Sequence, residues 1–295
     1  MPKPDELIAH SSQLKLLKDN FNNNFPHSWI FNGIKGIGKY KTAINFIQTI
    51  HNRPKNYNQH VFEINSDEKL VLLDDIRNLI SQISLTNADS DKKCFIVIDN
   101  ANLLNFNSFN ALLKTIEEPP ENTILFIICH DKKRIPKTIL SRCISLDFRP
   151  LTIDEIKKYC VLNEINLANF DLENNSNLIG GSIEKLLLFI SDEGIMIKNK
   201  LEKIINSEKL NIAEFESFFE MISKDVDKNF KIISNYIYSS QRSKYLQNIN
   251  NKVVLTKILK FFKNIEIFTK QDLNIDKKKE LHFLITEYID TNVHE

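Results

Sequence analysis

The pattern of hydrophobic and polar positions divides the chain into two parts. Up to about residue 150, short apolar runs alternate with amphipathic stretches. The runs are HSWIF (27–31), VFEI (61–64), CFIVID (94–99), TILFIIC (123–129) and ISLDF (144–148). Apolar runs of this length are typical of strands in a buried parallel sheet. Their alternation with helical stretches predicts an α/β domain whose sheet is covered by helices on both faces.

Helical spacing of apolar residues predicts the remaining elements. Residues 70–83 are amphipathic, and a second apolar face leads into EEPP (117–120), which we expect to end that helix. From Ile153 on, the pattern predicts helices and no strong strand. One clear stripe consists of Val254, Leu255, Ile258, Phe261, Phe262 and Ile265. We interpret this stripe as the core of a helical bundle, and residues 271–280 as a solvated turn.

The stretch GIKGIGKYK (33–41) is similar to a phosphate-binding loop with one substitution. Gly33, Gly38 and Lys39 meet the pattern G-x-x-x-x-G-K-[ST], and a predicted strand and helix flank them. Tyr40 stands where a serine or threonine hydroxyl would hold Mg²⁺. A tyrosine hydroxyl lies too far from the backbone to take that place. Thr42 does not replace it, because Gly38 and Lys39 set the register of the motif.

Later positions bear on whether ATP is hydrolysed. Asp99 ends a predicted strand, as a Walker B aspartate would, and Asn100 follows it where an active ATPase carries a carboxylate base. Arg142, in the SRC triplet (141–143), precedes the last predicted strand. It is either a surface ion-pair residue or one that reaches out of its own subunit. Glu184 stands four residues into the start of a predicted helix, where an ATPase lid would use an arginine.

Composition narrows the classes of function. Lys and Arg (39) nearly balance Asp and Glu (38), so nucleic-acid binding would need a local basic patch. The four cysteines include no C-x-x-C pair, which favours buried thiols in a cytoplasmic protein. No apolar run is long enough to span a membrane, and the first ten residues lack a signal-peptide core. His51 and His60 alone do not make a metal site, so we predict no zinc.

Three stretches together resemble the AAA+ clamp-loader family. They are FPHSWIFNGIKGIGK, NSFNALLKTIEEPPENTILFIICH and IPKTILSRC, within a resemblance that covers roughly residues 5–190. The resemblance implies a RecA-like AAA+ P-loop domain over 1–150 and a small helical lid domain over 151–198. It further implies a C-terminal helical collar domain over 199–295 that mediates oligomerisation.

The resemblance also implies a role in DNA replication. Subunits of that family form a hetero-oligomeric ring that opens a sliding clamp and places it on primed DNA. One subunit holds ATP and its neighbour completes the site with an arginine; carried over, Arg142 is this arginine, acting in trans. The degenerate nucleotide site would comprise Gly33, Gly36, Gly38, Lys39 and Asp99. The implied partners are an ATPase subunit and a delta-like subunit, with the clamp and DNA reached through the complex.

Two other functions stay as alternatives. An active AAA+ motor ATPase would be favoured by a hydroxyl residue after Lys39, a glutamate after Asp99 and an arginine at 184, and the sequence has none of them. A P-loop kinase would need an acceptor site and a phosphate-clamping lid, and no motif indicates either. We therefore predict a subunit without hydrolysis of its own. No cofactor is assigned, and weak binding of ATP or ADP is left open.

Overall fold

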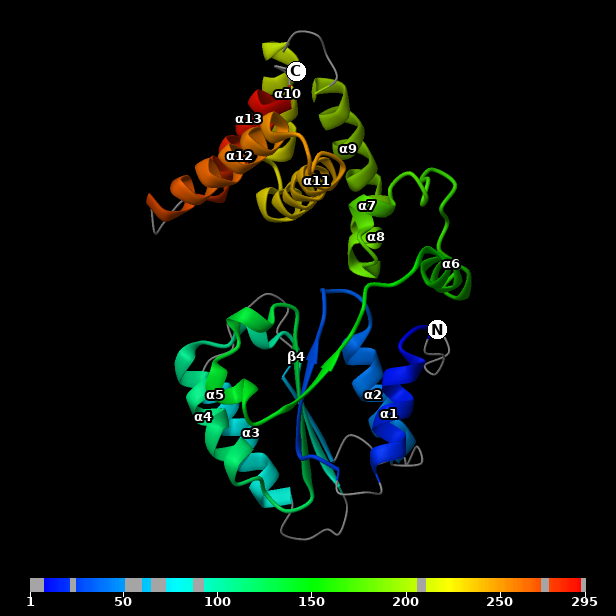
Figure 1. The fold of residues 1–295 in the computed structure, drawn as a ribbon, viewed down its shortest axis with the longest axis vertical. Helices are drawn as coiled ribbons and strands as arrows, with labels where there is room; N and C mark the ends of the chain where they lie inside the picture. The colour runs from blue at the N-terminus through cyan, green and yellow to red at the C-terminus, as the bar shows by residue number, and fades with distance from the viewer. Residues whose placement is uncertain are drawn as a thin grey trace. The chain divides into compact units, whose positions relative to one another are not determined.

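The computed structural model describes residues 8–21, 25–50, 60–64, 73–86, 93–205, 211–271 and 276–292 (Figure 1). The chain divides into two compact units, Met1–Asn163 and Glu164–Glu295. Every strand in the described ranges belongs to the first unit, and the second unit is helical there. The predicted fold class, α/β followed by all-α, is therefore confirmed, while the three-domain division at 150 and 198 stays a prediction.

A five-stranded parallel sheet forms the centre of the first unit, with the strand order β2-β3-β4-β1-β5. The strands are β1 (Ser28–Asn32), β2 (Val61–Ile64), β3 (Cys94–Ile98), β4 (Thr123–Cys129) and β5 (Ile144–Asp147). Each apolar run in the sequence forms one of these strands, with bounds that differ by no more than one residue. β3 and β4 are buried along their whole lengths, because both lie inside the sheet.

Helices cover the two faces of this sheet (Figure 1). On one face lie α1 (Ser11–Phe21) and α2 (Lys39–Ile50), and on the other α3 (Leu73–Thr86), α4 (Phe106–Glu117) and α5 (Lys137–Leu140). Side chains along a strand point alternately to the two faces. Trp29 and Phe31 accordingly pack in the core with α1 and α2, whereas Ile30 packs in the core with α3 and α4. One short strand thus contributes to both cores.

The predicted end of the helix at EEPP is confirmed. α4 ends at Glu117, and Glu118 leaves the helical region with φ −125° and ψ 71°. Pro119 accounts for this, because a proline disfavours the helical conformation of the residue before it. At the other end, the Asn105 side chain caps the helix by accepting a hydrogen bond from the Ser108 backbone N–H at 2.8 Å.

The second unit is a set of packed helices. They are α7 (Ser176–Ile179), α8 (Ile183–Ile190), α9 (Asp192–Ile205), α10 (Ile212–Ile222), α11 (Val226–Gln247), α12 (Lys252–Gln271) and α13 (Lys277–Asn292). From the predicted stripe, Ile258, Phe261 and Ile265 are buried in α12, while Phe262 is 38% exposed at its margin. Within the described part of the chain, no helix combines the length and the apolarity that a membrane span requires.

The predicted turn at 271–280 is wrong at Gln271, which ends α12, and over its last four residues. Residues 277–280 form the first turn of α13, and Asp276 caps it by accepting a hydrogen bond from the Lys278 backbone N–H at 3.2 Å. The run of lysines had suggested solvent, but exposed lysines are also compatible with a helix surface. Residues 272–275 lie outside the described residues. So do His51 and the part of the predicted helix at 70–83 that precedes residue 73.

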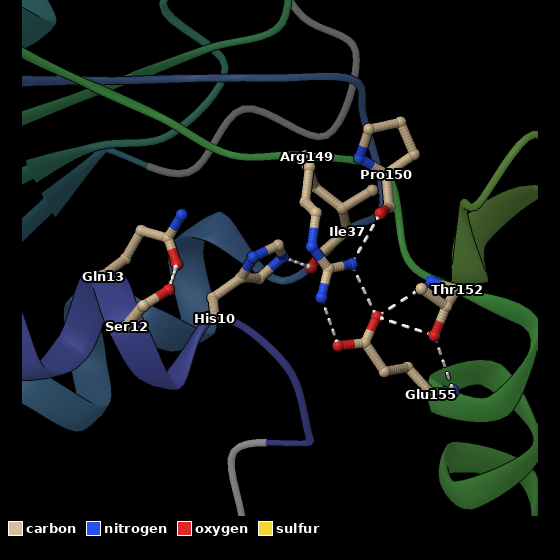
Figure 2. A network of polar contacts seen from close by, with 8 residues as sticks. All are labelled: His10, Ser12, Gln13, Ile37, Arg149, Pro150, Thr152 and Glu155. Carbon is tan, nitrogen blue, oxygen red and sulfur yellow. Dashed lines mark hydrogen bonds and ion pairs between the residues drawn. The ribbon is translucent and has the colours of Figure 1, made fainter.

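An ion pair holds the chain in place where it leaves the sheet and enters α6 (Ile153–Leu162) (Figure 2). Thr152 and Glu155 form a capping box: the Thr152 hydroxyl accepts from the Glu155 backbone N–H, and the Glu155 carboxylate accepts from that of Thr152. Arg149 donates two hydrogen bonds to the same carboxylate, at 2.7 and 2.8 Å. Chiefly through these bonds, Arg149 lowers the pKa of Glu155 to about 2.

Glu155→Gln should reduce the free energy of unfolding at pH 7 by about 1–2 kcal/mol, because the charge-assisted bonds are lost. The loss is limited because water screens Arg149, whose side chain is 55% exposed. Since the folded-state pKa of Glu155 lies below its unfolded value of 4.5, this stabilisation is complete above that value and is lost as the pH falls toward about 2.

Urea unfolding of both proteins over this range of pH measures the effect. The two stabilities should converge in acid, and a difference that stays constant with pH would contradict the assignment. Glu118→Gln, at an exposed position of the same unit, is the control and should leave stability within about 0.5 kcal/mol of the wild type.

Candidate functional site

The glycine loop at 33–39 joins β1 to α2 at the carboxyl edge of the sheet, the strand–loop–helix context expected from the sequence. Gly33, Gly36 and Gly38 all have positive φ, at 154°, 77° and 95°. A Cβ on Gly33 would lie 2.5 Å from the carbonyl oxygen of Phe148, so this position has no room for a side chain. The loop therefore depends on glycine for both conformation and space.

Lys39 is the first residue of α2 and is only 5% exposed. Its ammonium donates hydrogen bonds to the carbonyl oxygens of Gly33 at 2.6 Å and Ile34 at 2.7 Å. These bonds hold the positive charge inside the loop, beside the N-terminus of a helix. Backbone N–H groups and the helix dipole favour anions at such a position. Chemically, the loop can take a phosphate group.

The hydroxyl groups near the loop are already engaged. Tyr40 donates a hydrogen bond to the Glu63 carboxylate on β2, with 2.5 Å between the oxygens. Thr42 is buried, and its hydroxyl donates to the Gly38 carbonyl at 3.0 Å. Neither supplies the small hydroxyl ligand that a P-loop gives to Mg²⁺. The residues that follow Lys39 therefore do not fit the ion that this fold implies.

The end of β3 carries an aspartate followed by an amide. One carboxylate oxygen of Asp99 accepts a hydrogen bond from the Asn100 backbone N–H at 2.9 Å. Asn100 has φ 56° and ψ 50°, a left-handed conformation that asparagine tolerates well. Its amide oxygen is buried without a hydrogen-bond partner in the described structure. An amide at this place cannot accept the proton that a general base would take.

Arg142 lies at the surface, in the segment that joins α5 to β5. Its Nε pairs with the Glu117 carboxylate at 2.7 Å, and its NH1 donates to the Thr138 carbonyl at 3.0 Å. The side chains of Arg142 and Glu117 are 42% and 50% exposed. Both contacts come from α4 and α5, which cover the opposite face of the sheet from α2. The surface ion pair considered from the sequence is thus present, and Arg142 is not brought together with the glycine loop of its own chain.

Two further residues, Glu184 and Cys129, have ordinary structural contacts. Glu184 is in the first turn of α8 and lies 3.5 Å from the Lys231 ammonium on α11, within the second unit. Cys129, the last residue of β4, is buried, and burial raises the pKa of its thiol to about 11. Its sulfur lies 3.7 Å from the Asn32 side-chain oxygen. Cys129 is therefore a neutral thiol at pH 7.

Sequence reasoning missed two residues that hold segments at the carboxyl edge of the sheet. His10 is buried, its Nε2 donates to the Ile37 carbonyl at 2.9 Å (Figure 2), and burial lowers its pKa, so the ring is neutral. Asn102 donates to the Asp131 carbonyl and accepts from the His130 backbone N–H, both at 2.8 Å. It thereby joins the segments that follow β3 and β4. A single histidine or asparagine outside a motif carries no signal in one sequence.

The strand order, the glycine loop after β1 and the aspartate after β3 define the first unit as an AAA+ P-loop domain. Residues 9–152 match the family model described as DNA polymerase III, delta subunit. A DNA polymerase III gamma subunit-related protein from Thermotoga maritima has a similar fold, with a TM-score of 0.57. It is 18% identical and covers 95% of this chain and 99% of its own.

Two curated relatives are tau subunits of DNA polymerase III. That of Escherichia coli (strain K12) is 30% identical over 161 residues, and that of Bacillus subtilis (strain 168) is 26% identical over 246 residues. These matches cover 48% and 76% of this chain, and it spans only 25% and 42% of the two relatives. The family model and these relatives thus match this chain over part of its length. They do not distinguish a delta-prime subunit from a gamma or tau subunit.

Proposed function

We propose that the chain is a non-hydrolysing subunit of a DNA polymerase III clamp loader, of the delta-prime type, and acts in DNA replication. One observation carries this proposal: the glycine loop is intact, yet the Tyr40 hydroxyl is bonded to Glu63 and an amide stands at Asn100. The metal ligand and the base are thus both replaced, while the loop that shapes a nucleotide site is kept. A domain of this kind contributes to the structure of a ring of subunits without hydrolysing ATP itself.

In the ring, Arg142 acts on nucleotide held by the neighbouring subunit. The guanidinium is always charged and presents a fork of donors that can bridge two phosphate oxygens. Its present partner, Glu117, lies at the surface and does not enclose it. The expected partners are an ATPase subunit and a delta-like subunit, and the chain reaches the sliding clamp and primed DNA through them.

An active motor subunit is the second candidate. The tau relatives and the retained Lys39 and Asp99 favour it. The Tyr40–Glu63 hydrogen bond and Asn100 weigh against it, because loss of a general base alone reduces a rate by roughly 10²–10⁴-fold. The two candidates differ in whether the isolated chain turns over ATP.

The isolated chain should release no phosphate from ATP above background, because both the metal ligand and the base are replaced. The measurement is phosphate release in the presence of Mg²⁺, with Lys39→Ala as the control for contaminating enzymes. Equal, low signals from both proteins are expected. Turnover typical of motor ATPases, if abolished by Lys39→Ala, would establish the motor alternative.

Arg142→Ala should reduce clamp- and DNA-stimulated ATP hydrolysis by the reassembled complex several-fold. Arginine fingers contribute about 10³–10⁵-fold in favourable cases, and the loss here is smaller because other sites in the ring keep their arginines. Arg142→Lys should also reduce this hydrolysis, since an ammonium does not reproduce the fork of donors of a guanidinium. The assay is steady-state hydrolysis at saturating ATP, with clamp loading measured in parallel.

Two variants separate this role from the surface ion pair. Arg134→Ala removes another exposed arginine, paired with Asp131 at 3.8 Å, and should leave hydrolysis unchanged. Glu117→Ala breaks the pair but keeps Arg142, and it should also preserve hydrolysis. Equal losses from Glu117→Ala and Arg142→Ala would mean that Arg142 has only a local structural role. The free energy of unfolding of each single variant should lie within about 1 kcal/mol of the wild-type value, because exposed ion pairs contribute little to stability.

The helical second unit mediates oligomerisation through apolar side chains left exposed on α12. Val253 and Leu259 are 68% and 62% exposed. Val253→Glu and Leu259→Glu, made singly, should each weaken co-purification with the other subunits, because a carboxylate is costly to bury in an apolar contact. Ser217→Glu adds the same charge at an exposed polar position on α10 and is the control. If each α12 variant co-purifies as fully as the wild type, the exposed side chains of α12 do not contribute to the subunit contacts.

A further inference from the structure

β5 is an edge strand of the sheet, and its outer side is open. It pairs with β1 alone, and three of its four residues are exposed, with Ile144 at 49%. An open edge of this kind presents backbone N–H and C=O groups that can pair with another extended strand. The groups that point outward from β5 therefore decide what this edge can bind.

The register of β5 on β1 shows which backbone groups point outward. The Phe148 N–H donates to the Asn32 carbonyl of β1 at 2.7 Å, so the backbone groups of Leu146, two residues earlier, also face β1. Those of Ser145 and Asp147 face away from the sheet. In the part of the chain that the structure describes, the Ser145 N–H and carbonyl and the Asp147 N–H have no hydrogen-bond partner.

Two opposite charges lie on one face of this edge. The Lys132 ammonium donates to the Ser145 hydroxyl at 2.8 Å. The Asp147 side chain projects to the same face as that of Ser145, and one of its carboxylate oxygens accepts from the Asn32 amide at 2.8 Å. On the opposite face, Leu146 packs partly buried against the core beside α1 and α2. The edge thus has a cation near its start and an anion near its end.

We propose that two copies of this chain pair through β5 as antiparallel strands, related by a twofold axis at Leu146. Ser145 of each copy then lies opposite Asp147 of the other, and the two residues exchange both backbone hydrogen bonds. The two Leu146 side chains meet at the axis. Each Lys132 lies beside the Asp147 carboxylate of the second copy. The contact is isologous, and it is self-complementary in hydrogen bonds, charge and apolar surface.

Charge favours this direction of pairing. Parallel strands in register would place Lys132 beside Lys132 and Asp147 beside Asp147, and like charges at a strand pair are destabilising. The antiparallel pairing displaces one existing contact, the bond from the Gln13 side chain to the Asp147 carbonyl, which is long at 3.2 Å. A backbone N–H of the second copy replaces it.

The association is weak, because a strand of four residues forms a small contact, and small interfaces are typical of transient complexes. It uses neither Arg142 nor the glycine loop. The self-association is therefore independent of the proposed function.

Sedimentation equilibrium of the full chain at increasing concentration measures the self-association. The apparent mass should rise from 34.4 kDa toward twice that value. Ser145→Pro should remain monomeric, because it removes the outward N–H, while the sheet tolerates a proline on an edge strand at a position whose N–H faces solvent. Ser145→Ala is the matched control: it also loses the bond to Lys132 but keeps the N–H, so it should still form dimers.

Cysteine substitutions test the register of the two strands. Leu146→Cys places two thiols opposite each other at a non-hydrogen-bonded pair, where Cβ atoms lie about 4.5–5.5 Å apart, close to the spacing of a disulfide. Ile144→Cys, on the same face, lies opposite Phe148 of the second copy and should cross-link much more slowly. The native cysteines are buried, which limits the background. Mild oxidation followed by non-reducing gel electrophoresis compares the two rates.

Two results overturn the inference: a wild-type chain that stays monomeric up to its solubility limit, or a dimer that persists in folded Ser145→Pro. If Ser145→Pro does not fold, the cross-linking decides, and equal rates for Leu146→Cys and Ile144→Cys would exclude this pairing. None of these results bears on the proposed subunit role, which ATP hydrolysis by the assembled complex tests separately.

Discussion

The first unit depends on the burial of a parallel sheet on both faces. β1 shows how closely this constrains the chain, because Trp29 and Phe31 enter one core while Ile30 enters the other. A parallel sheet needs crossovers that return the chain to the same edge, so the segments after the strands gather at the carboxyl ends. The glycine loop, Asp99 and Cys129 lie at this edge because each stands at the end of a strand or directly after one. Apolar burial of the paired strands thus positions the site.

The polar contacts at that edge turn inward, toward the protein itself. Lys39 is bonded to carbonyls of its own loop, Tyr40 to an adjacent strand and Thr42 to its own helix. These contacts stabilise the loop and the start of α2, so a ligand at the loop would have to displace some of them.

The strands and the end of α4 could be predicted from the sequence, because apolar runs and the EEPP stretch act through local rules. The glycine loop could also be predicted, because its sequence motif requires a particular backbone conformation. Glu63 and Glu117 could not be found in this way. Their partners, Tyr40 and Arg142, are 23 and 25 residues distant, and only the folded sheet brings the pairs together. The turn at 277–280 was mistaken because charge alone does not separate a helix surface from a loop.

The pairing of Arg142 with Glu117 has a consequence for the role that we propose for Arg142 between subunits. A free arginine side chain has about 2 kcal/mol of rotamer entropy to lose on being ordered. Glu117 and the Thr138 carbonyl already restrict it, so part of this entropy is lost when the chain folds and not when subunits meet. The pair is also exposed and weak, so a new anionic partner displaces Glu117 at little cost. The Arg142 side chain is thus ordered before a partner binds, and it can still leave Glu117 easily.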